Sequence, residues 1–420
     1  MGLLYFMGVC ISFALLGCGA HGLPLQKEII PFMERSQTKR QAGLEVTVAM
    51  PSKKEVEDIF DSNLIENNIQ PIWIHIKNNQ DKPYMFLPLL VDQNYYPPYE
   101  VTYKLDISKE EKGYTAIQEK SIHHFIKPRG EIEGYIFTNL VHGTKRITIG
   151  VIGHGSLETF VFYVQDPGIQ FDYQRMDFEH LYPAHERIYL SEAELRENLE
   201  RLPCCTTSQD GRELGDPLNI VIIGDFERVL NAFIDNGWDE TELLTTQNMV
   251  RAARAFLSGS SYRHTIISPL YCFGRMQDLS MQKPRKTISA RNHLRLWMTP
   301  MMFKNDPVWI GQISRDVGVR MTLEAWPPFT HKISPVVDEA REYLVENMVI
   351  SNRLAELGFV RGLKWVSPSD PRRNLTGDPY FTDGLRAVLV IADTPTQINQ
   401  IELLNWEWPS EYRDVIDFIF

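Results

Sequence analysis

Several motifs that mark common enzyme classes are missing from this 420-residue chain. A phosphate cradle needs the glycines of GxGxxG or GxxxxGKS after a buried strand, and only Gly224 stands at such a turn. The motifs HExxH and GxSxG are also absent, so neither a zinc-protease helix nor the nucleophile elbow of α/β-hydrolases is encoded. These absences exclude the usual signatures of nucleotide binding, zinc proteolysis and serine hydrolysis.

Cysteine is scarce, with five residues in the whole chain. That number is too small for a disulfide framework, and no CxxC or HxxxH spacing accompanies it, so we expect no metal site and no cofactor. Beyond the first eighteen residues only Cys204, Cys205 and Cys272 remain. They are either buried free thiols or include one bridge from Cys204 or Cys205 to Cys272.

Positive charge is also in short supply, since the formal net charge is −11. Phosphate backbones are bound by clustered Lys and Arg, so this balance argues against nucleic acid as a partner. Hydrophobic residues make up 43% and charged residues 23% of the chain, which is the composition of a protein with an ordinary apolar core.

The one long apolar run is at the start, from Leu3 to Leu16, and it leads into Gly17 and Cys18. This pattern resembles the lipobox of bacterial lipoproteins, which implies cleavage of residues 1–17 and a palmitate-bearing lipid on Cys18. The run is shorter than the roughly 20 residues that span a bilayer, so a transmembrane anchor is the weaker alternative. By analogy with such lipoproteins, Gly19 places the chain in the bacterial cell envelope, at the outer membrane facing the periplasm.

Next in the sequence we expect a polar, flexible tether over 18–42 and a mainly β, sandwich-like domain over 43–168. In the second segment, Ile72, Ile74 and Ile76 alternate with Trp73 and His75, as in a half-buried strand. Residues 169–202 are expected to be a connector containing one helix that begins at the capping box of Ser191.

A second domain is expected over 203–420, with α/β or α+β architecture because strand and helix patterns are mixed in order. Its predicted strands are 219–223, 270–273, 293–297, 308–313 and 385–391, and its predicted helices are 226–234, 247–257 and 337–357.

Several ordered motifs in residues 203–395 resemble the LssY C-terminal domain family. These motifs are Asp216-Pro217-Leu218-Asn219, Ser268-Pro269-Leu270-Tyr271, Gln282-Lys283-Pro284-Arg285, His293-Leu294-Arg295-Leu296-Trp297, Ser314-Arg315-Asp316, Thr330-His331, Asp338-Glu339-Ala340-Arg341-Glu342-Tyr343-Leu344 and Tyr380-Phe381-Thr382-Asp383-Gly384. The resemblance implies a domain found in envelope proteins, without an activity that can be transferred. The leader and the β-rich region that precede it here differ from the membrane-embedded region of the protein that names the family.

The motifs also suggest a ligand site. On a strand, His293, Arg295 and Trp297 share one face, which could form the floor of a site for an anionic ligand. The window 275–320 carries nine Lys or Arg against three Asp, so it has an excess of six positive charges. Such a local excess of positive charge in an acidic chain attracts anionic groups such as lipid headgroups. The candidate ligand-binding residues are Lys283, Arg285, Arg295, Trp297 and Arg315. The alternative is a covered face in which Arg295 pairs with a carboxylate.

A hydrolase or a metal-dependent enzyme is the rival hypothesis to binding or assembly at the envelope. His293, Arg295, Asp316, His331 and Asp338 supply the residue types for such chemistry, although none has diagnostic spacing. Asp338 is three residues before Arg341, so a local ion pair also explains it. The expected partners are therefore the bilayer, through Cys18, and either an anionic envelope ligand or a protein.

The leader makes a direct prediction. Cells fed labelled palmitate should yield a labelled protein whose mature N-terminus is Cys18 by mass spectrometry, because the lipobox directs both cleavage and lipidation. Cys18→Ala should remove the label. Absence of label from both the natural chain and the variant would refute the anchor.

Overall fold

The computed structural model describes residues 30–243, 245, 267–284, 291–321 and 329–409. Three predictions lie outside these ranges: the lipid site at Cys18, the ligand residue Arg285 and the helix over 247–257. Within these ranges, no helix is long and apolar enough to cross a membrane.

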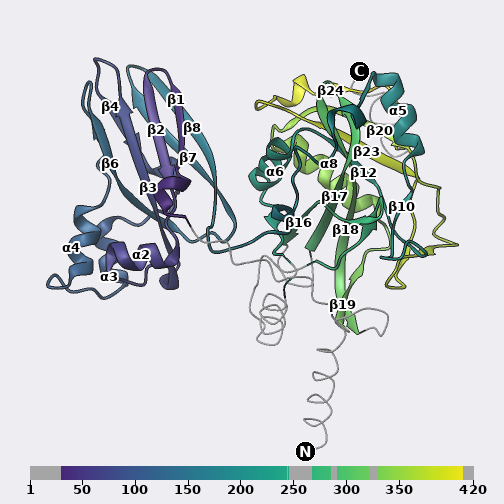
Figure 1. Ribbon diagram of the computed structural model, residues 1–420, viewed down its shortest axis with the longest axis horizontal. Helices are drawn as coiled ribbons and strands as arrows, with labels where there is room; N and C mark the ends of the chain where they lie inside the picture. Colours follow the sequence, from purple (N-terminus) through teal and green to yellow (C-terminus); the bar gives the residue numbers. More distant parts are fainter. Residues whose placement is uncertain (1–29, 244, 246–266, 285–290, 322–328, 410–420) are drawn as a thin grey trace, which may run out of the picture.

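The N-terminal part is a pair of antiparallel four-stranded sheets that pack face to face (Figure 1). The first sheet has the order β1 (Gln37–Gln41), β2 (Leu44–Ala49), β3 (Ile69–Asn78), β6 (Glu131–Asn139). The second has the order β5 (Phe125–Ile126), β4 (Tyr84–Leu87), β7 (Thr144–Gly153), β8 (Ser156–Gln165). Three short helices lie at one end, α2 (Lys53–Phe60), α3 (Pro98–Lys104) and α4 (Lys112–Glu119).

The core of this sandwich follows the predicted alternation. Ile72, Ile74 and Ile76 of β3 are fully buried, and they share one cluster with Ile149 and Phe162 of the opposite sheet. Each sheet therefore turns its apolar face inward and leaves its other face more accessible, as strands with a period of two require. The expectation of a β-rich N-terminal region is confirmed.

The tether predicted over 18–42 is wrong for its last residues. Gln37–Gln41 form β1, which pairs along its length with β2. Every residue of β1 is exposed, because it is an edge strand that depends on main-chain hydrogen bonds more than on burial. Just before it, Arg35 forms an ion pair of 3.0 Å with Glu55 of α2. A polar sequence without an apolar period therefore does not establish disorder.

The C-terminal part is built on a ten-stranded mixed sheet. Its main path is β13 (Asp239–Glu240), β16 (Leu279–Pro284), β17 (Arg291–Phe303), β18 (Asp306–Met321), β12 (Ile220–Ile223), β23 (Leu385–Ile391), β20 (Leu354–Arg361), β24 (Glu402–Leu403), while β9 (Ile188–Leu190) pairs with β17 and β19 (Phe329–Ile333) pairs with β18. Smaller pairings join β11 (Leu214–Pro217), β10 (Cys205–Thr207), β14 (Tyr271–Cys272) and β15 (Arg275–Met276), and join β21 (Arg372–Arg373) with β22 (Pro379–Tyr380).

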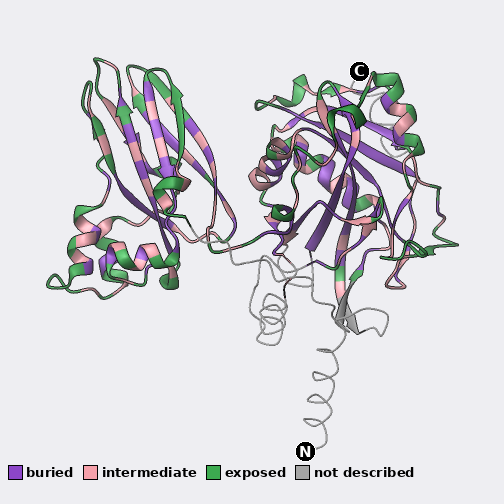
Figure 2. Ribbon diagram, viewed as in Figure 1, coloured by how far each residue is buried: buried purple, intermediate pink, exposed green. Residues whose placement is uncertain are grey.

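Helices cover both faces of this sheet. The helices α6 (Phe226–Asp235) and α8 (Asp338–Ile350) pack on the face that carries Ile222 and Leu296. The helix α5 (Glu192–Arg201) packs on the face that carries Val221 and Trp297. The strands between the helices are buried over most of their length, as Figure 2 shows. The expected mixed C-terminal fold is therefore confirmed, and it is α+β because most strand pairs are antiparallel.

Residues 169–202, which we expected to be a connector, are part of the same body. Phe171 and Tyr173 lie in its core, and β9 pairs in parallel with the end of β17. The predicted capping box is present, since Ser191 accepts from the main chain of Glu194 and the Glu194 side chain accepts in return. This segment therefore closes one edge and one face of the sheet.

The helix predicted over 337–357 is wrong in its second half. α8 ends at Ile350, Asn352 has a positive φ of 58°, and Leu354–Arg361 form β20 against β23. The apolar residues of a short buried strand have no distinctive period, so they can extend a helical pattern by chance.

Carboxylates at the end of α6 and in β13 hold the two bodies together. Asp235 accepts a 2.8 Å hydrogen bond from the Tyr163 hydroxyl of β8, and it pairs with Arg146 of β7 and with Arg353. Glu240 is 2% exposed and accepts from both the main chain and the hydroxyl of Thr144, each at 2.7 Å.

Asp235→Asn should weaken this attachment, because two guanidinium groups lose their shared carboxylate. Hydrogen bonds to charged groups contribute roughly 1–3 kcal/mol, so the free energy of unfolding should fall by about that amount. Calorimetry should show a lower melting temperature, or two transitions in place of one. Asp81→Asn is the control, because it breaks an exposed ion pair with Arg129 in which both residues belong to the N-terminal part. An unchanged single transition for Asp235→Asn would show that this carboxylate does not couple the bodies.

Candidate functional site

Three of the five proposed catalytic residues meet on the face of the sheet that α5 covers. His293 Nε2 lies 2.8 Å from Asp316 Oδ2, and both side chains are almost fully buried. Arg295 donates to Gln312 Oε1 at 2.9 Å and to the Ser268 carbonyl at 3.0 Å. The pairing of β17 with β18 sets this arrangement, because it places Arg295 opposite Gln312.

Arg295 is surrounded by further acidic groups. Burial lowers the pKa of its guanidinium, while the nearby carboxylates of Asp216 and Asp316 act in the opposite direction. Asp216 is itself buried, which raises its pKa, and Asn374 donates to it at 2.8 Å. The opposite charges of the guanidinium and the carboxylates therefore offset part of the cost of burying each of them, as buried charges require.

The expected ligand floor of Arg295 and Trp297 is not an open surface. Trp297 is fully buried in the cluster that contains Leu195 and Leu199 of α5, and its indole donates to the Arg275 carbonyl at 3.2 Å. The expectation failed because strand alternation defines two faces but does not say which of them another element covers.

Asp338 belongs to a different network. It accepts from the Thr382 hydroxyl at 2.8 Å and lies 3.3 Å from Arg341, so the local ion pair predicted from the sequence is confirmed. Arg341 is fully buried and forms a bidentate ion pair with Asp383, with hydrogen bonds of 2.7 and 2.8 Å. Asp383 and Gly384 form a turn before β23, since Gly384 has a φ of 89° and the main-chain N–H of Leu385 donates to Asp383.

The fifth candidate, His331, is placed only through its main chain, which pairs with Val319 in β18–β19. Its side chain lies outside the described part of the chain. The other four candidates split into the His293 network and the Asp338 network, so they do not surround one open pocket. Among the side chains that the structure describes, no group of three or more His, Cys, Asp or Glu could hold a metal ion.

Two of the predicted basic ligand residues meet on the opposite face of the sheet. Lys283 and Arg315 approach the ring of Tyr343, at 5.6 and 5.5 Å from its centre. Lys283 Nζ also donates to the Asn236 carbonyl and to Asn347 Oδ1, at 2.5 and 3.1 Å. Both cations therefore have structural partners on α8 or at the end of α6.

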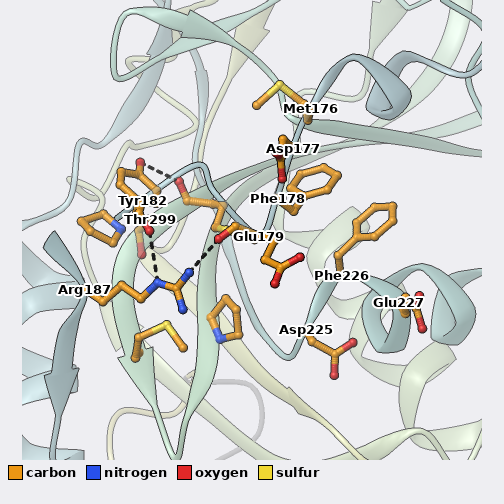
Figure 3. Close-up of a pocket in the computed structure, with 14 residues that line it drawn as sticks. Met176, Asp177, Phe178, Glu179, Tyr182, Arg187, Asp225, Phe226, Glu227 and Thr299 are labelled. Carbon is orange, nitrogen blue, oxygen red and sulfur yellow. Dashed lines mark hydrogen bonds between the residues drawn. The ribbon is translucent and has the colours of Figure 1, made fainter. Parts of the chain in front are cut away.

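The described part of this domain also has an open groove, which our sequence reasoning missed (Figure 3). Its volume is about 630 Å³, which is within the range of ligand sites. It is lined by Met176, Asp177, Phe178, Glu179, Tyr182, Arg187, Asp225, Phe226, Glu227, Met298, Thr299, Pro300, Met302 and Pro307.

The floor of the groove is aromatic and well packed. The rings of Phe178 and Phe226 stack with centres 4.3 Å apart and planes 15° apart, and Trp309 lies 5.3 Å from Phe178. Both phenylalanines are only partly buried. A packed aromatic surface of this kind offers apolar area at low cost in side-chain entropy.

The rim of the groove is acidic. The same tripeptide, Asp-Phe-Glu, occurs at 177–179 and at 225–227, so each stacked phenylalanine is preceded by an aspartate and followed by a glutamate that also line the groove. The one basic residue in the lining, Arg187, donates to the carbonyls of Tyr182 and Glu179, at 3.1 and 2.7 Å. The repeated tripeptide is the sequence signal that could have located the groove.

The N-terminus of α6, at the edge of the groove, is not available to an anionic ligand. Asp225 caps this helix and accepts from the Arg228 main chain at 2.9 Å, so its own carboxylate occupies the position that an anionic ligand would take.

Residues 196–385 match the model of a protein family described as LssY C-terminus. The match begins within α5 and ends at the first residue of β23. It includes the second Asp-Phe-Glu tripeptide but not the first. No curated protein matches the chain.

One buried carboxyl of the C-terminal body, that of Asp172, makes the stability of the protein depend on pH. Asp172 is 7% exposed, its Oδ2 accepts from the Ser280 hydroxyl, and burial raises its pKa to about 7. The folded chain therefore holds a proton that the unfolded chain releases near its ordinary pKa, so stability is lost as pH rises from about 4 to about 7.

Asp172→Asn removes this titration. The variant should match the natural chain at pH 4 and exceed its stability well above pH 7 by up to about 4 kcal/mol, measured by denaturant unfolding. Asp58→Asn, at an exposed position of α2, is the control. A stability difference that does not change with pH would show that Asp172 is ionised in the folded state throughout.

Proposed function

Residues 196–385 are an LssY C-terminal domain, and from that premise we propose that the chain is a lipid-anchored protein of the bacterial cell envelope that binds a partner protein. The run ending in Gly17 and Cys18 supports the anchor, and Gly19 supports an outer-membrane location facing the periplasm. The observation that carries the binding role is the groove, with its aromatic floor and its acidic rim.

The occupant that fits this groove is a peptide segment in which Lys or Arg alternates with apolar side chains. Its apolar side chains would cover Phe178 and Phe226, and its cations would lie along the acidic rim. In that rim Asp177 and Asp225 also contact His180 and Arg228. Cations are also attracted to the faces of aromatic rings. This replaces the anionic ligand suggested by the sequence, because the same rim repels an anion.

An enzyme is supported less well. His293 and Asp316 are a pair of catalytic residue types, but both side chains are almost fully buried, and Arg295 in the same network is held by an amide and a carbonyl. A general acid or base has to reach the substrate within hydrogen-bond distance. The open groove is lined by none of these three side chains.

The test is the binding of a short fluorescent peptide of alternating Lys and Leu to the full-length chain in detergent, followed by fluorescence anisotropy. The double variant Asp177→Lys/Glu227→Lys reverses the charge on both sides of the groove and should weaken binding about tenfold or more, which corresponds to about 1.4 kcal/mol. Added salt should weaken binding to the natural chain, since exposed charges are screened.

Glu197→Lys/Glu200→Lys is the matched control, because it makes the same change of charge on the exposed side of α5. It should leave the affinity within about twofold of the natural value. Equal weakening by both double variants would mean that only net charge matters. Equal affinity for a Glu–Leu peptide, or no binding of the Lys–Leu peptide, would contradict the proposed role of the groove.

A further inference from the structure

An apolar row crosses the outer face of the second sheet of the sandwich. The register pairs Phe125 of β5 with Met85 of β4, Met85 with Ile152 of β7, and Ile152 with Leu157 of β8. Side chains of directly paired residues lie on the same face of a sheet. Phe125, Ile152 and Leu157 are 75%, 42% and 50% exposed. Each of the four strands therefore contributes one apolar side chain to this row.

The fold does not need these four side chains. Their sequence neighbours Ile126, Phe86 and Val151 are buried and supply the inner face of the same sheet. The outer face of such an antiparallel sheet normally carries polar residues, because it meets water. A run of large apolar side chains on an accessible surface marks a contact with another body.

A second group of apolar residues adjoins the row. Leu89 and Leu90 of η3 (Pro88–Leu90) are 61% and 39% exposed. Leu90 fills the space that a side chain at position 150 would take, and Gly150 pairs with Leu87 in the register next to the row. The apolar surface is therefore broader than one line of side chains.

The C-terminal body leaves the apolar row accessible. It contacts the opposite end of the same strands, where Arg146 and Tyr163 meet Asp235. The row lies beside the turn that joins β7 to β8, at the end of the sandwich remote from α2, α3 and α4 (Figure 1).

Two exposed lysines lie next to the row. Lys82 precedes β4 and Lys127 follows β5, and their carbonyls both accept from the Asn78 amide, at 2.7 and 3.0 Å. Within the described ranges, neither lysine forms an ion pair. The carboxylates of this end have partners, since Asp81 pairs with Arg129 and Glu158 accepts from Gln41. Two positive charges are therefore left to meet an anion beside the apolar surface.

We propose that the apolar row, with Lys82 and Lys127, docks on a bilayer that contains anionic lipids. Phe125, Ile152 and Leu157 enter the boundary between headgroups and acyl chains, and the two ammonium groups contact headgroup phosphates. These three side chains carry no hydrogen-bonding group, so they suit a fluid apolar layer and place no directional demand on a partner.

The tether suits the same occupant, and this step alone rests on the proposed anchor. Cys18 is twelve residues before Ile30, so the intervening chain spans at most about 40 Å. A ten-residue strand such as β7 is about 33 Å long. A bilayer that holds Cys18 can therefore also meet the apolar row.

The test is photocrosslinking of the full-length chain to vesicles in which one phosphatidylcholine carries a photoreactive acyl chain, followed by peptide mass spectrometry. A lipid probe avoids thiol labelling, because Cys204, Cys205 and Cys272 are free thiols and do not include the bridge that the sequence left open. In mixed vesicles of phosphatidylcholine and phosphatidylglycerol, peptides that contain Met85 and Ile152 should be labelled. In phosphatidylcholine alone their labelling should fall several-fold.

Two double variants separate the apolar and the charged contributions. Phe125→Ser/Leu157→Ser should lower the labelling of Met85 and Ile152 about tenfold or more, because two side chains no longer enter the bilayer. Lys82→Glu/Lys127→Glu should lower it about tenfold, and only in the anionic vesicles.

Matched controls lie at the other end of the sandwich. Tyr99→Ser/Tyr103→Ser removes two aromatic side chains of α3 that are 68% and 78% exposed, and Lys54→Glu/Lys112→Glu reverses two exposed lysines of α2 and α4. Both should keep the labelling within about twofold of the natural value.

Three outcomes would overturn the proposal. The first is label confined to residues 1–29, and the second is equal loss in the test and control variants. The third is a dimer, seen by light scattering, that Phe125→Ser/Leu157→Ser dissociates, because a second copy would then cover the row. The labelled peptide itself identifies the contact, so missing palmitate at Cys18 or a groove that binds no peptide would leave this result unchanged.

Discussion

The antiparallel pairing of β17 with β18 is the interaction on which the rest of the C-terminal body depends. These are the two longest strands, and their register places Leu296 opposite Gly311 and Trp297 opposite Ile310. Because successive side chains point to opposite faces, one pairing supplies apolar surface both to α6 and α8 and to α5. A shift of one residue would exchange these two faces and bury polar side chains against the wrong helices.

Buried arginines lie both in this sheet and in the helix α8 that packs against it. Arg341 is neutralised by carboxylates on α8 and in the turn before β23, whereas Arg295 is held by an amide and a carbonyl within a wider acidic network. Arg386 donates to main-chain carbonyls instead. Taking an ion out of water costs several kcal/mol, so each guanidinium imposes its own requirement on the side chains around it. All three requirements are met by fixed structural partners, which for Arg386 are main-chain carbonyls.

The groove depends on a different part of the architecture. One Asp-Phe-Glu tripeptide precedes β9 and the other begins α6, so they are brought together only when residues 169–202 close over the sheet edge. The stacked rings of Phe178 and Phe226 join these segments and hold the carboxylates around a shared apolar floor. The groove is thus a product of packing between segments that the sequence had assigned to a connector and to a folded domain.

The sequence by itself determined the elements whose signals are local. The capping box of α5, the limits of β23 and the alternation in β3 could all be predicted, because caps and side-chain periods depend on neighbouring residues. It also named His293, Arg295 and Asp316 among five candidate site residues, but it did not determine that these three would meet apart from Asp338. Tertiary structure alone decided that this network is covered, that β1 is an edge strand, that α8 gives way to β20, and that two distant tripeptides share a groove. Each of these outcomes depends on which distant segment covers a given surface, and that contact has no counterpart in local spacing.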